Sequence, residues 1–223
     1  MLPHRNLDRM STVLWSRLMT TVNSNLTRSC VRLINLTIPT DTKTTPTTVS
    51  KTFSGQNTWA ETLYQTLRSM DVTLFTYVPD AGHGATINRA IEDTQVTTVP
   101  LATEEEGVSL LAGAHLGGVR GVLLMQSSGV GNCINMLSLT NIGRFPLISI
   151  VSMRGDYGEQ NPWQFPMGQG TQPCLEAMGT ICSRVDNADD VAAATQAAVN
   201  MAYRSDQSVA LLLSQKLIGA KPF

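Results

Sequence analysis

Residues 97–126 read TTVPLATEEEGVSLLAGAHLGGVRGVLLMQ, and this stretch contains one complete strand–helix–strand unit. A β-rich run at 97–101 leads into an apolar segment rich in alanine and glycine at 104–116, and a second apolar run follows at 121–126. Strand-length runs that are apolar on both faces and alternate with helices predict a parallel sheet that is covered on both sides. The expected fold class is therefore α/β.

The same alternation continues on both sides of this unit. We expect further helices at 58–70, 85–93, 131–140 and 188–204, and further strands at 72–78, 146–151, 180–184 and 208–213. Residues 152–170 are expected to form a long irregular loop before a short helix. The result is a six-stranded parallel sheet with helices on both faces. Because ligands bind beyond the carboxyl ends of such strands, the loops to inspect are those after Val78, Leu101, Gln126 and Val151.

Composition limits the class of protein. The chain has 223 residues, of which 42% are hydrophobic and 15% are charged, and this is typical of one globular domain with at most an appendage. The formal net charge of −1 argues against nucleic acid as a partner. No apolar run approaches the roughly 18 residues of a membrane span. Four cysteines without a CxxC pair, and three histidines, do not predict a metal cluster, so we expect reduced thiols in a cytoplasmic protein.

Residues 1–51 differ in charge and composition from residues 52–223. The first part contains seven basic and two acidic residues and ends in a Ser/Thr-rich run, whereas the second contains nine basic and fifteen acidic residues. A run of this kind has little to bury, so we expect 1–51 to be a poorly ordered extension or the product of a start codon placed too far upstream. A transit peptide is the alternative. We expect the working domain to span residues 52–223.

Three consecutive acids, Glu104 to Glu106, stand between an expected strand and an uncharged helix. Acids in the first turn of a helix complement its dipole, and this accounts for Glu105 and Glu106 without any further role. We expect the uncharged helix behind them to be buried. A carboxylate on its inner side would then be partly desolvated, as is typical of a tuned acid or base.

Residues 125–132, MQSSGVGN, are expected to form a strand-to-helix turn whose glycines let the backbone approach a ligand. Backbone amides at the start of the next helix could hold an anion. The stretch lacks the motifs of a P-loop, of a dinucleotide fingerprint and of a hydrolase elbow, so Ser127 and Ser128 are poor nucleophile candidates. A tight turn that simply needs small residues is the alternative.

Several blocks of this sequence resemble the alpha subunit of sulfopyruvate decarboxylase and the corresponding half of phosphonopyruvate decarboxylase. The blocks are 103–118, 124–132, 150–156 and 166–169, and the resemblance covers about residues 55–220 in order and with matching spacing. Both families are thiamine-diphosphate-dependent 2-oxo acid decarboxylases. The resemblance implies that this chain is a pyrimidine-binding domain and that it helps to convert an anionic substrate, such as 3-sulfopyruvate or 3-phosphonopyruvate, into an aldehyde and CO2.

The resemblance also implies a partner. Such enzymes pair the pyrimidine-binding domain with a diphosphate-binding domain, whose Gly-Asp-Gly and later Asn-Asn supply the oxygen-rich site that Mg²⁺ requires. The nearest match here is Gly155-Asp156-Tyr157, with no Asn-Asn downstream. We therefore expect a beta subunit that carries this motif to hold the diphosphate and Mg²⁺, in a hetero-oligomer such as α2β2 or larger.

Catalytic roles follow from the same resemblance. A family glutamate hydrogen-bonds N1′ of the aminopyrimidine and favours the tautomer that removes the C2 proton of the thiazolium. The spacing to Gly113 assigns this role to Glu104, with Glu105 as the alternative. Asp80 matches a substrate-facing acid that relays a proton, although an Asx-turn or helix cap would also explain it. His83 is either a proton donor or a loop residue without a catalytic task.

The remaining assignments concern binding. Cofactor contacts are expected from Pro79, Gln126, Ser128, Gly129, Gly131 and Asn132. Substrate contacts are expected from Ser127 and from Arg154, whose guanidinium suits a sulfonate, phosphonate or carboxylate. A salt bridge of Arg154 with Asp156 or Glu159 is the alternative.

Two other functions stay open for the whole chain. The first is a non-catalytic domain retained for assembly or regulation, which would not need a carboxylate at position 104. The second is a carboligase subunit of the acetolactate synthase type, which uses the same cofactor chemistry. The presence of Glu104 favours catalysis over the first of these.

Overall fold

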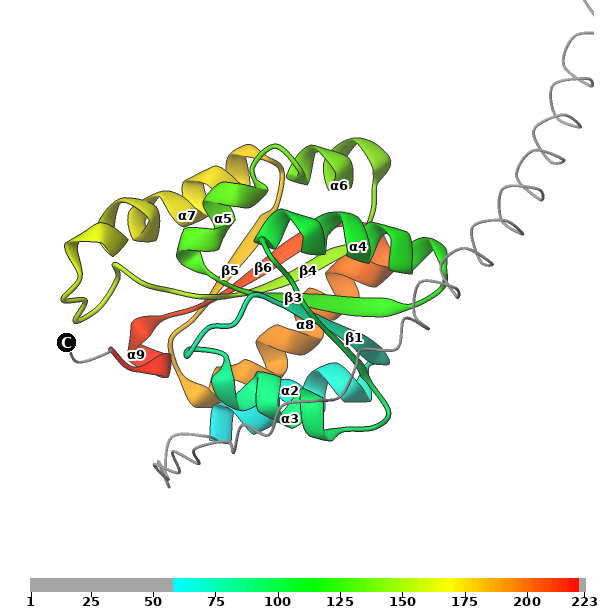
Figure 1. Cartoon of the computed structure of the whole chain (residues 1–223), viewed down its shortest axis with the longest axis horizontal. Coiled ribbons are helices and arrows are strands. Elements are labelled where there is room, and N and C mark those ends of the chain that lie inside the picture. The colour runs from blue at the N-terminus through cyan, green and yellow to red at the C-terminus, as the bar shows by residue number, and fades with distance from the viewer. Residues whose placement is uncertain (1–57, 221–223) are drawn as a thin grey trace, which may run out of the picture. The chain divides into compact units, whose positions relative to one another are not determined.

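The computed structural model describes residues 58–220, which form one sheet between two helical layers (Figure 1). The strands are β1 (Val72–Tyr77), β2 (Thr97–Pro100), β3 (Arg120–Gln126), β4 (Leu147–Ser152), β5 (Ile181–Val185) and β6 (Ser208–Leu213). Their order in the sheet is β2-β1-β3-β4-β6-β5, and every neighbouring pair is parallel. The predicted six-stranded parallel α/β sheet is confirmed. Predictions about residues 1–51, and about the start of the domain at residue 52, lie outside the described residues.

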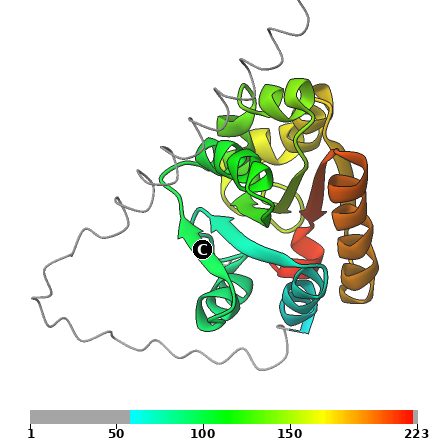
Figure 2. The same cartoon turned by 90° about the vertical axis from the view of Figure 1, so that its right-hand side faces the viewer.

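Helices cover both faces of the sheet (Figures 1 and 2). One layer contains α2 (Thr58–Ser69), α3 (Gly84–Glu92) and α8 (Val191–Ser205). The other contains α4 (Glu104–Leu116), α5 (Ser127–Cys133), α6 (Leu137–Gly143) and α7 (Phe165–Ala177). The short elements are η1 (Pro162–Gln164), η2 (Ala188–Asp190) and α9 (Gln215–Ile218). Within residues 58–220, no helix has the length and apolar character needed to cross a bilayer.

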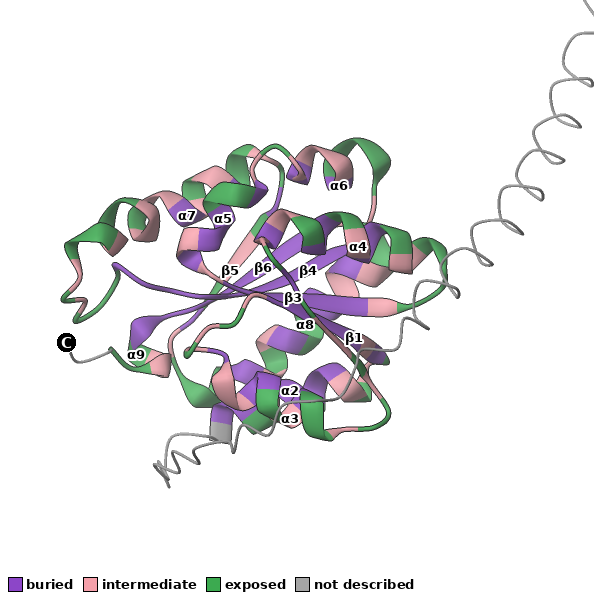
Figure 3. Cartoon of the chain, viewed as in Figure 1, coloured by how far each residue is buried: buried purple, intermediate pink, exposed green. Residues whose placement is uncertain are grey.

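The central strands are apolar on both faces because each face has its own core. Successive residues of β3 alternate between the two cores: Leu124 packs in the α2–α8 layer, and Leu123 in the α4–α7 layer. β4 and β6 are buried at every position, as Figure 3 shows by colour. Burying a side chain of the size of leucine contributes about 1.5–3 kcal/mol, so these two strands anchor the sheet.

The order of the strands reverses at β1. β1 lies between β2 and β3 in the sheet. After β1 the chain adds β2 on one side of it, and then crosses over and adds β3 on its other side. At such a reversal the connections diverge and open a crevice beyond the carboxyl ends of the strands. The loops after β1 and β3 therefore meet where a ligand site is expected.

The segment after β3 differs from the prediction. Residues 127–132 were expected to form a turn, but they belong to the helix α5, and the helix expected at 131–140 is divided between α5 and α6. The loop expected at 152–170 is also shorter, because α7 begins at Phe165. Gly129 and Gly131 lower the helix propensity of this stretch, but packing of α5 against α4 and α7 outweighs that preference.

Helix α4 is less buried than expected. Its inner side, which includes Val108 and Leu111, is buried, but Ser109 and Gly113 are exposed and Leu116 is 76% exposed. The expectation rested on the absence of charge along this helix. Small uncharged residues can also lie at a surface, so the absence of charge did not indicate burial here.

Candidate active site

Glu104 lies at the first position of α4, just beyond the carboxyl end of β2, and its carboxylate packs against α5. The residue is 8% exposed, and its Oε2 accepts a hydrogen bond of 2.8 Å from Nδ2 of Asn132. Its Oε1 lies over the backbone of Gly129, where an added Cβ would be only 2.2 Å away. The glycine is therefore required by the close approach of this carboxylate.

The two neighbouring acids behave differently from each other. Glu106 reaches back to the start of its own helix, where its Oε2 accepts a hydrogen bond of 3.0 Å from the backbone N–H of Ala102. This is a capping interaction, as the helix-dipole interpretation suggests. Glu105 has a buried Oε2 with no hydrogen-bond partner among the described residues. An unsatisfied buried carboxylate oxygen is costly, so Glu105 remains the alternative to Glu104 as the ligand-facing acid.

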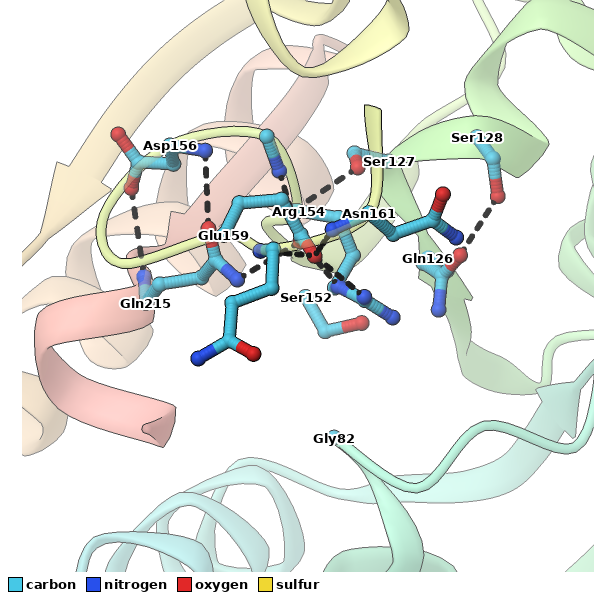
Figure 4. Close-up of polar contacts among 12 residues, drawn as sticks. Gly82, Gln126, Ser127, Ser128, Ser152, Arg154, Asp156, Glu159, Asn161 and Gln215 are labelled. Carbon is cyan, nitrogen blue, oxygen red and sulfur yellow. Dashed lines mark hydrogen bonds and ion pairs between the residues drawn. The ribbon is translucent and has the colours of Figure 1, made fainter. Parts of the chain in front are cut away.

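Asp80 joins three loops through its carboxylate. Oδ2 accepts from Ser152 Oγ at 2.6 Å and from the Gly82 N–H at 2.9 Å, and Oδ1 accepts from Gln126 Nε2 at 2.9 Å. The Gly82 contact is the Asx-turn that was the alternative for this residue. The contacts to Ser152 and Gln126 are not part of this turn, because they link the loop after β1 to the last residues of β4 and β3. Figure 4 labels these three partners, Gly82, Gln126 and Ser152.

Gln126 links this cluster to α5. Its amide donates to Asp80, while its Oε1 accepts a hydrogen bond of 2.8 Å from Ser128 Oγ. Gly129 and Asn132, on the same helix, contact Glu104. The stretch 126–132 therefore connects both acidic groups.

Ser152 was not predicted. It is the last residue of β4, which is buried at every position, and it is 1% exposed. The only signal in the sequence was a hydroxyl at the carboxyl end of a buried strand.

His83 is completely buried in the loop after β1. Its Nε2 lies 3.1 Å from the carbonyl oxygen of Met125, so Nε2 donates, and Nδ1 has no hydrogen-bond partner among the described residues. Burial lowers the pKa of His83, and the negative charge of Asp80 only partly opposes this effect. A buried neutral imidazole does not fit the predicted role of substrate-facing proton donor. It instead ties the first loop to β3.

Arg154 is bound to Glu159 through two nitrogens. Nε and Nη2 donate to the two carboxylate oxygens at 2.6 and 2.8 Å, and the side chains are 8% and 1% exposed (Figure 4). The hydrogen bonds to Glu159 raise the pKa of Arg154, and the guanidinium in turn holds the pKa of Glu159 well below its usual range. The predicted clamp on substrate does not fit this pairing; the salt-bridge alternative with Glu159 does.

Ser127 also has an internal role. Its side chain is buried, its Oγ accepts a hydrogen bond of 3.0 Å from the backbone N–H of Arg154, and its carbonyl accepts one of 3.2 Å from Thr171 Oγ1. The hydroxyl therefore joins α5 to the loop after β4. Its predicted contact with substrate is not supported by these bonds.

The other predicted residues lie at the surface of the same edge. Pro79 and Gly131 are exposed, and Ser128 is half-buried. Trp163, which was not among the residues predicted to bind the cofactor or the substrate, lies in η1 just before α7 and is 84% exposed. Within residues 58–220, no group of three or more His, Cys, Asp and Glu side chains is placed to hold a metal ion.

A polar cavity of about 280 Å³ lies elsewhere in the molecule. Thr140, Arg144, Gly179 and Ser208 are among the residues that line it. Ser208 begins β6, so this cavity lies near the amino ends of the strands and includes none of the predicted site residues.

No family model matches the sequence. The chain is 34% identical over 155 residues to the sulfopyruvate decarboxylase subunit alpha of Methanococcus maripaludis, a match that covers 69% of this chain and 93% of that protein. It is 31% identical over 151 residues to the protein of the same name from Methanocaldococcus jannaschii, covering 67% and 89% of the two chains. Phosphonopyruvate decarboxylase of Streptomyces viridochromogenes is 32% identical over 160 residues, which are 70% of this chain and 40% of that enzyme.

The fold is also found in a solved structure. A 2-oxoglutarate:ferredoxin oxidoreductase from Magnetococcus marinus matches with a TM-score of 0.57 over 72% of this chain and 29% of that chain. Its sequence identity is 16%, so this likeness concerns the fold alone.

Proposed function

The chain belongs to the family of sulfopyruvate decarboxylase alpha subunits, and on this premise we propose that it is the pyrimidine-binding half of a thiamine-diphosphate-dependent decarboxylase of anionic 2-oxo acids. The observation that carries the proposal is the placement of Glu104 against Gly129 and Asn132 at the carboxyl edge of the sheet. Among the described residues, only Asn132 donates a hydrogen bond to this carboxylate, so one of its oxygens is left for a ligand.

The residues at this edge fit the aminopyrimidine of thiamine diphosphate. Glu104 is a recessed hydrogen-bond acceptor beside a helix start, and Glu105 has an unpartnered buried oxygen next to it. When bound, thiamine diphosphate supplies the electron sink for loss of CO2 from the 2-oxo acid. The task of Glu104 is to accept a hydrogen bond and so hold a proton at the pyrimidine ring nitrogen.

Asp80 is the second group that we propose to act on a proton. Ser152 and Gln126 fix its carboxylate in one orientation at the end of the sheet. From this position it would deliver the proton that replaces the lost carboxylate. Its orientation does not depend on flexible surface groups, since both donors end buried strands.

We also propose a beta subunit that carries Gly-Asp-Gly and Asn-Asn and holds the diphosphate and Mg²⁺ in a cytoplasmic complex, α2β2 or larger. The near match at Asp156 is committed to protein contacts, because its carboxylate pairs with Arg184 and accepts from the backbone N–H of Gln215. The relatives are named as alpha subunits, which supports a divided enzyme. The exposed Trp163 and the edge around Glu104 would form the interface.

The proposal also concerns the substrate and the product of the reaction. The names of the relatives support 3-sulfopyruvate or 3-phosphonopyruvate, which share a 2-oxo acid group and a second anionic group. A carboligase would use the same residues but release a condensed product instead of an aldehyde.

The test is co-expression of the full chain with the product of an adjacent reading frame that carries Gly-Asp-Gly and Asn-Asn. Light scattering should show a complex, and the complex with thiamine diphosphate and Mg²⁺ should release CO2 and an aldehyde from one of a panel of 2-oxo acids. The chain alone should be inactive. A stable monomer that does not bind this partner would overturn the proposed assembly. A complex that converts none of the 2-oxo acids would favour the non-catalytic function in assembly or regulation.

A further inference from the structure

Two residues of α5 form a recess for the Glu104 carboxylate. Gly129 and Asn132 are three positions apart, so they lie on the same face of the helix. The missing Cβ of Gly129 leaves room for Oε1, and the Asn132 amide binds Oε2 at 2.8 Å. The two oxygens are therefore not equivalent, because one is occupied by a side-chain donor and the other lies over bare backbone.

The surroundings of Glu104 offer no other anchor. Among the described residues, Glu104 takes part in no ion pair, and Asn132 is the only group that donates a hydrogen bond to its side chain. The nearby Cys133 thiol is neutral, since burial, reinforced by the charges of Glu104 and Glu105, raises its pKa to about 12. Glu105 adds a like charge that would repel a carboxylate free to rotate.

We infer that Asn132 is the positioning residue of this site: its amide locks the Glu104 carboxylate so that Oε1 is the oxygen offered to a ligand. This inference rests on the proposed function and makes it more specific. Asn132 was predicted to touch the cofactor itself. In the structure its amide is directed to the carboxylate instead, so its effect on the reaction passes through Glu104.

The contact can be tested without any assumption about activity, by thermal unfolding of the full chain. Asn132→Asp keeps the shape of the side chain but sets two carboxylates at hydrogen-bond distance, and it should lower Tm by about 2–4 °C. The matched control is Asn135→Asp, which adds the same charge three residues further along at an exposed position and should leave Tm unchanged. Equal Tm shifts in the two variants would overturn the inference.

A swap of the two groups sharpens this test. In the double variant Glu104→Gln/Asn132→Asp, the glutamine amide can donate to the new carboxylate, so Tm should return to the wild-type value. Recovery of Tm would show that the two side chains interact directly, and a double variant no more stable than Asn132→Asp would overturn the inference. C2–H exchange of thiamine diphosphate should stay lost in the double variant whatever the role of Asn132, because no carboxylate remains at position 104.

The catalytic arm uses the complex with the diphosphate-binding partner. Asn132→Ala should slow C2–H exchange, followed by NMR, about tenfold, while the affinity for thiamine diphosphate with Mg²⁺, measured by calorimetry, should change less than threefold. If Glu104→Gln abolishes exchange and Asn132→Ala leaves it intact, the inference fails and the proposed function stands. If Glu104→Gln leaves exchange intact, the catalytic role of Glu104 fails, and with it that of Asn132; if Glu105→Gln also leaves exchange intact, the proposed function fails as well.

Discussion

Two recessed glutamates at the same edge of the sheet have opposite surroundings. Glu159 accepts hydrogen bonds from six groups, namely two nitrogens of Arg154, the amide of Gln215 and three backbone N–H groups (Figure 4). Within residues 58–220, Glu104 accepts one side-chain hydrogen bond, from Asn132. A carboxylate whose bonding capacity is filled holds the fold together, whereas one with an oxygen to spare is available to a ligand. Substitution of Glu104 should therefore impair the reaction, whereas substitution of Glu159 should reduce the stability of the fold.

The largest effect is expected at Glu104. Glu104→Gln should reduce C2–H exchange of thiamine diphosphate in the complex by roughly 10²–10⁴-fold, because a proton-transfer group is lost. The free energy of unfolding should stay within about 0.5 kcal/mol of wild type, since the replaced group has few partners. Exchange followed by NMR and urea denaturation check the two parts. If Glu105→Gln abolishes exchange and Glu104→Gln does not, the neighbouring acid is the catalytic one.

Glu159→Gln should show the reverse pattern. Removing one member of a buried ion pair leaves an uncompensated charge, so the free energy of unfolding should fall by about 3 kcal/mol, as urea denaturation would measure. The control is Glu61→Gln, which breaks an ion pair whose acid side chain is 50% exposed and should cost less than about 1 kcal/mol. Similar losses in both variants would contradict the structural role of Glu159.

Gly129→Ala tests the recess rather than the carboxylate. The new Cβ would meet Glu104 Oε1 at 2.2 Å, so the carboxylate must move, and C2–H exchange should fall about tenfold. Gly113→Ala is the control, because no atom lies within 4 Å of its Cβ position on α4. It should leave exchange unchanged and stabilise the helix by up to about 1 kcal/mol. Equal exchange rates in the two variants would show that the recess is not required.

The smallest effect concerns pH. Folding lowers the pKa of His83 from its ordinary value near 6.5. At a pH between these two pKa values, His83 is protonated in the unfolded chain and neutral in the folded one, so the unfolded chain binds more protons. Stability from the neutral imidazole is present above pH 6.5 and is lost as the pH falls below it, by about 1 kcal/mol per pH unit. The depressed pKa of Glu159 adds a second loss only below about pH 4.3. In urea denaturation, the His83→Gln variant should no longer lose stability just below pH 6.5, but it should still lose stability below about pH 4.3.

The sheet was predictable because its central strands β3, β4 and β6 are short, mainly apolar runs between helical segments. The prediction failed where glycines stand inside a helix: Gly129 and Gly131 indicated a turn, and only packing of α5 between α4 and α7 makes the stretch helical. It also failed at Leu116, because an uncharged helix can be exposed on one side.

The site was predictable in part. Family resemblance pointed to Glu104 and to the stretch 126–132, and the structure brings these residues together. The partner choice of Arg154 was open in the sequence, because Asp156 and Glu159 are both near it along the chain. Ser152, at the end of β4, and Gln215, at the start of α9, were missed, since an uncharged polar residue gives no signal until its distant partners are known.

The contact between Gly129 and Glu104 has a consequence for how such genes diverge. A single nucleotide change in a glycine codon introduces a side chain at position 129, and that side chain would displace the carboxylate without altering the glutamate codon. A glutamate at position 104 is therefore not enough by itself to indicate a correctly placed carboxylate in a related sequence, and position 129 has to be inspected together with it.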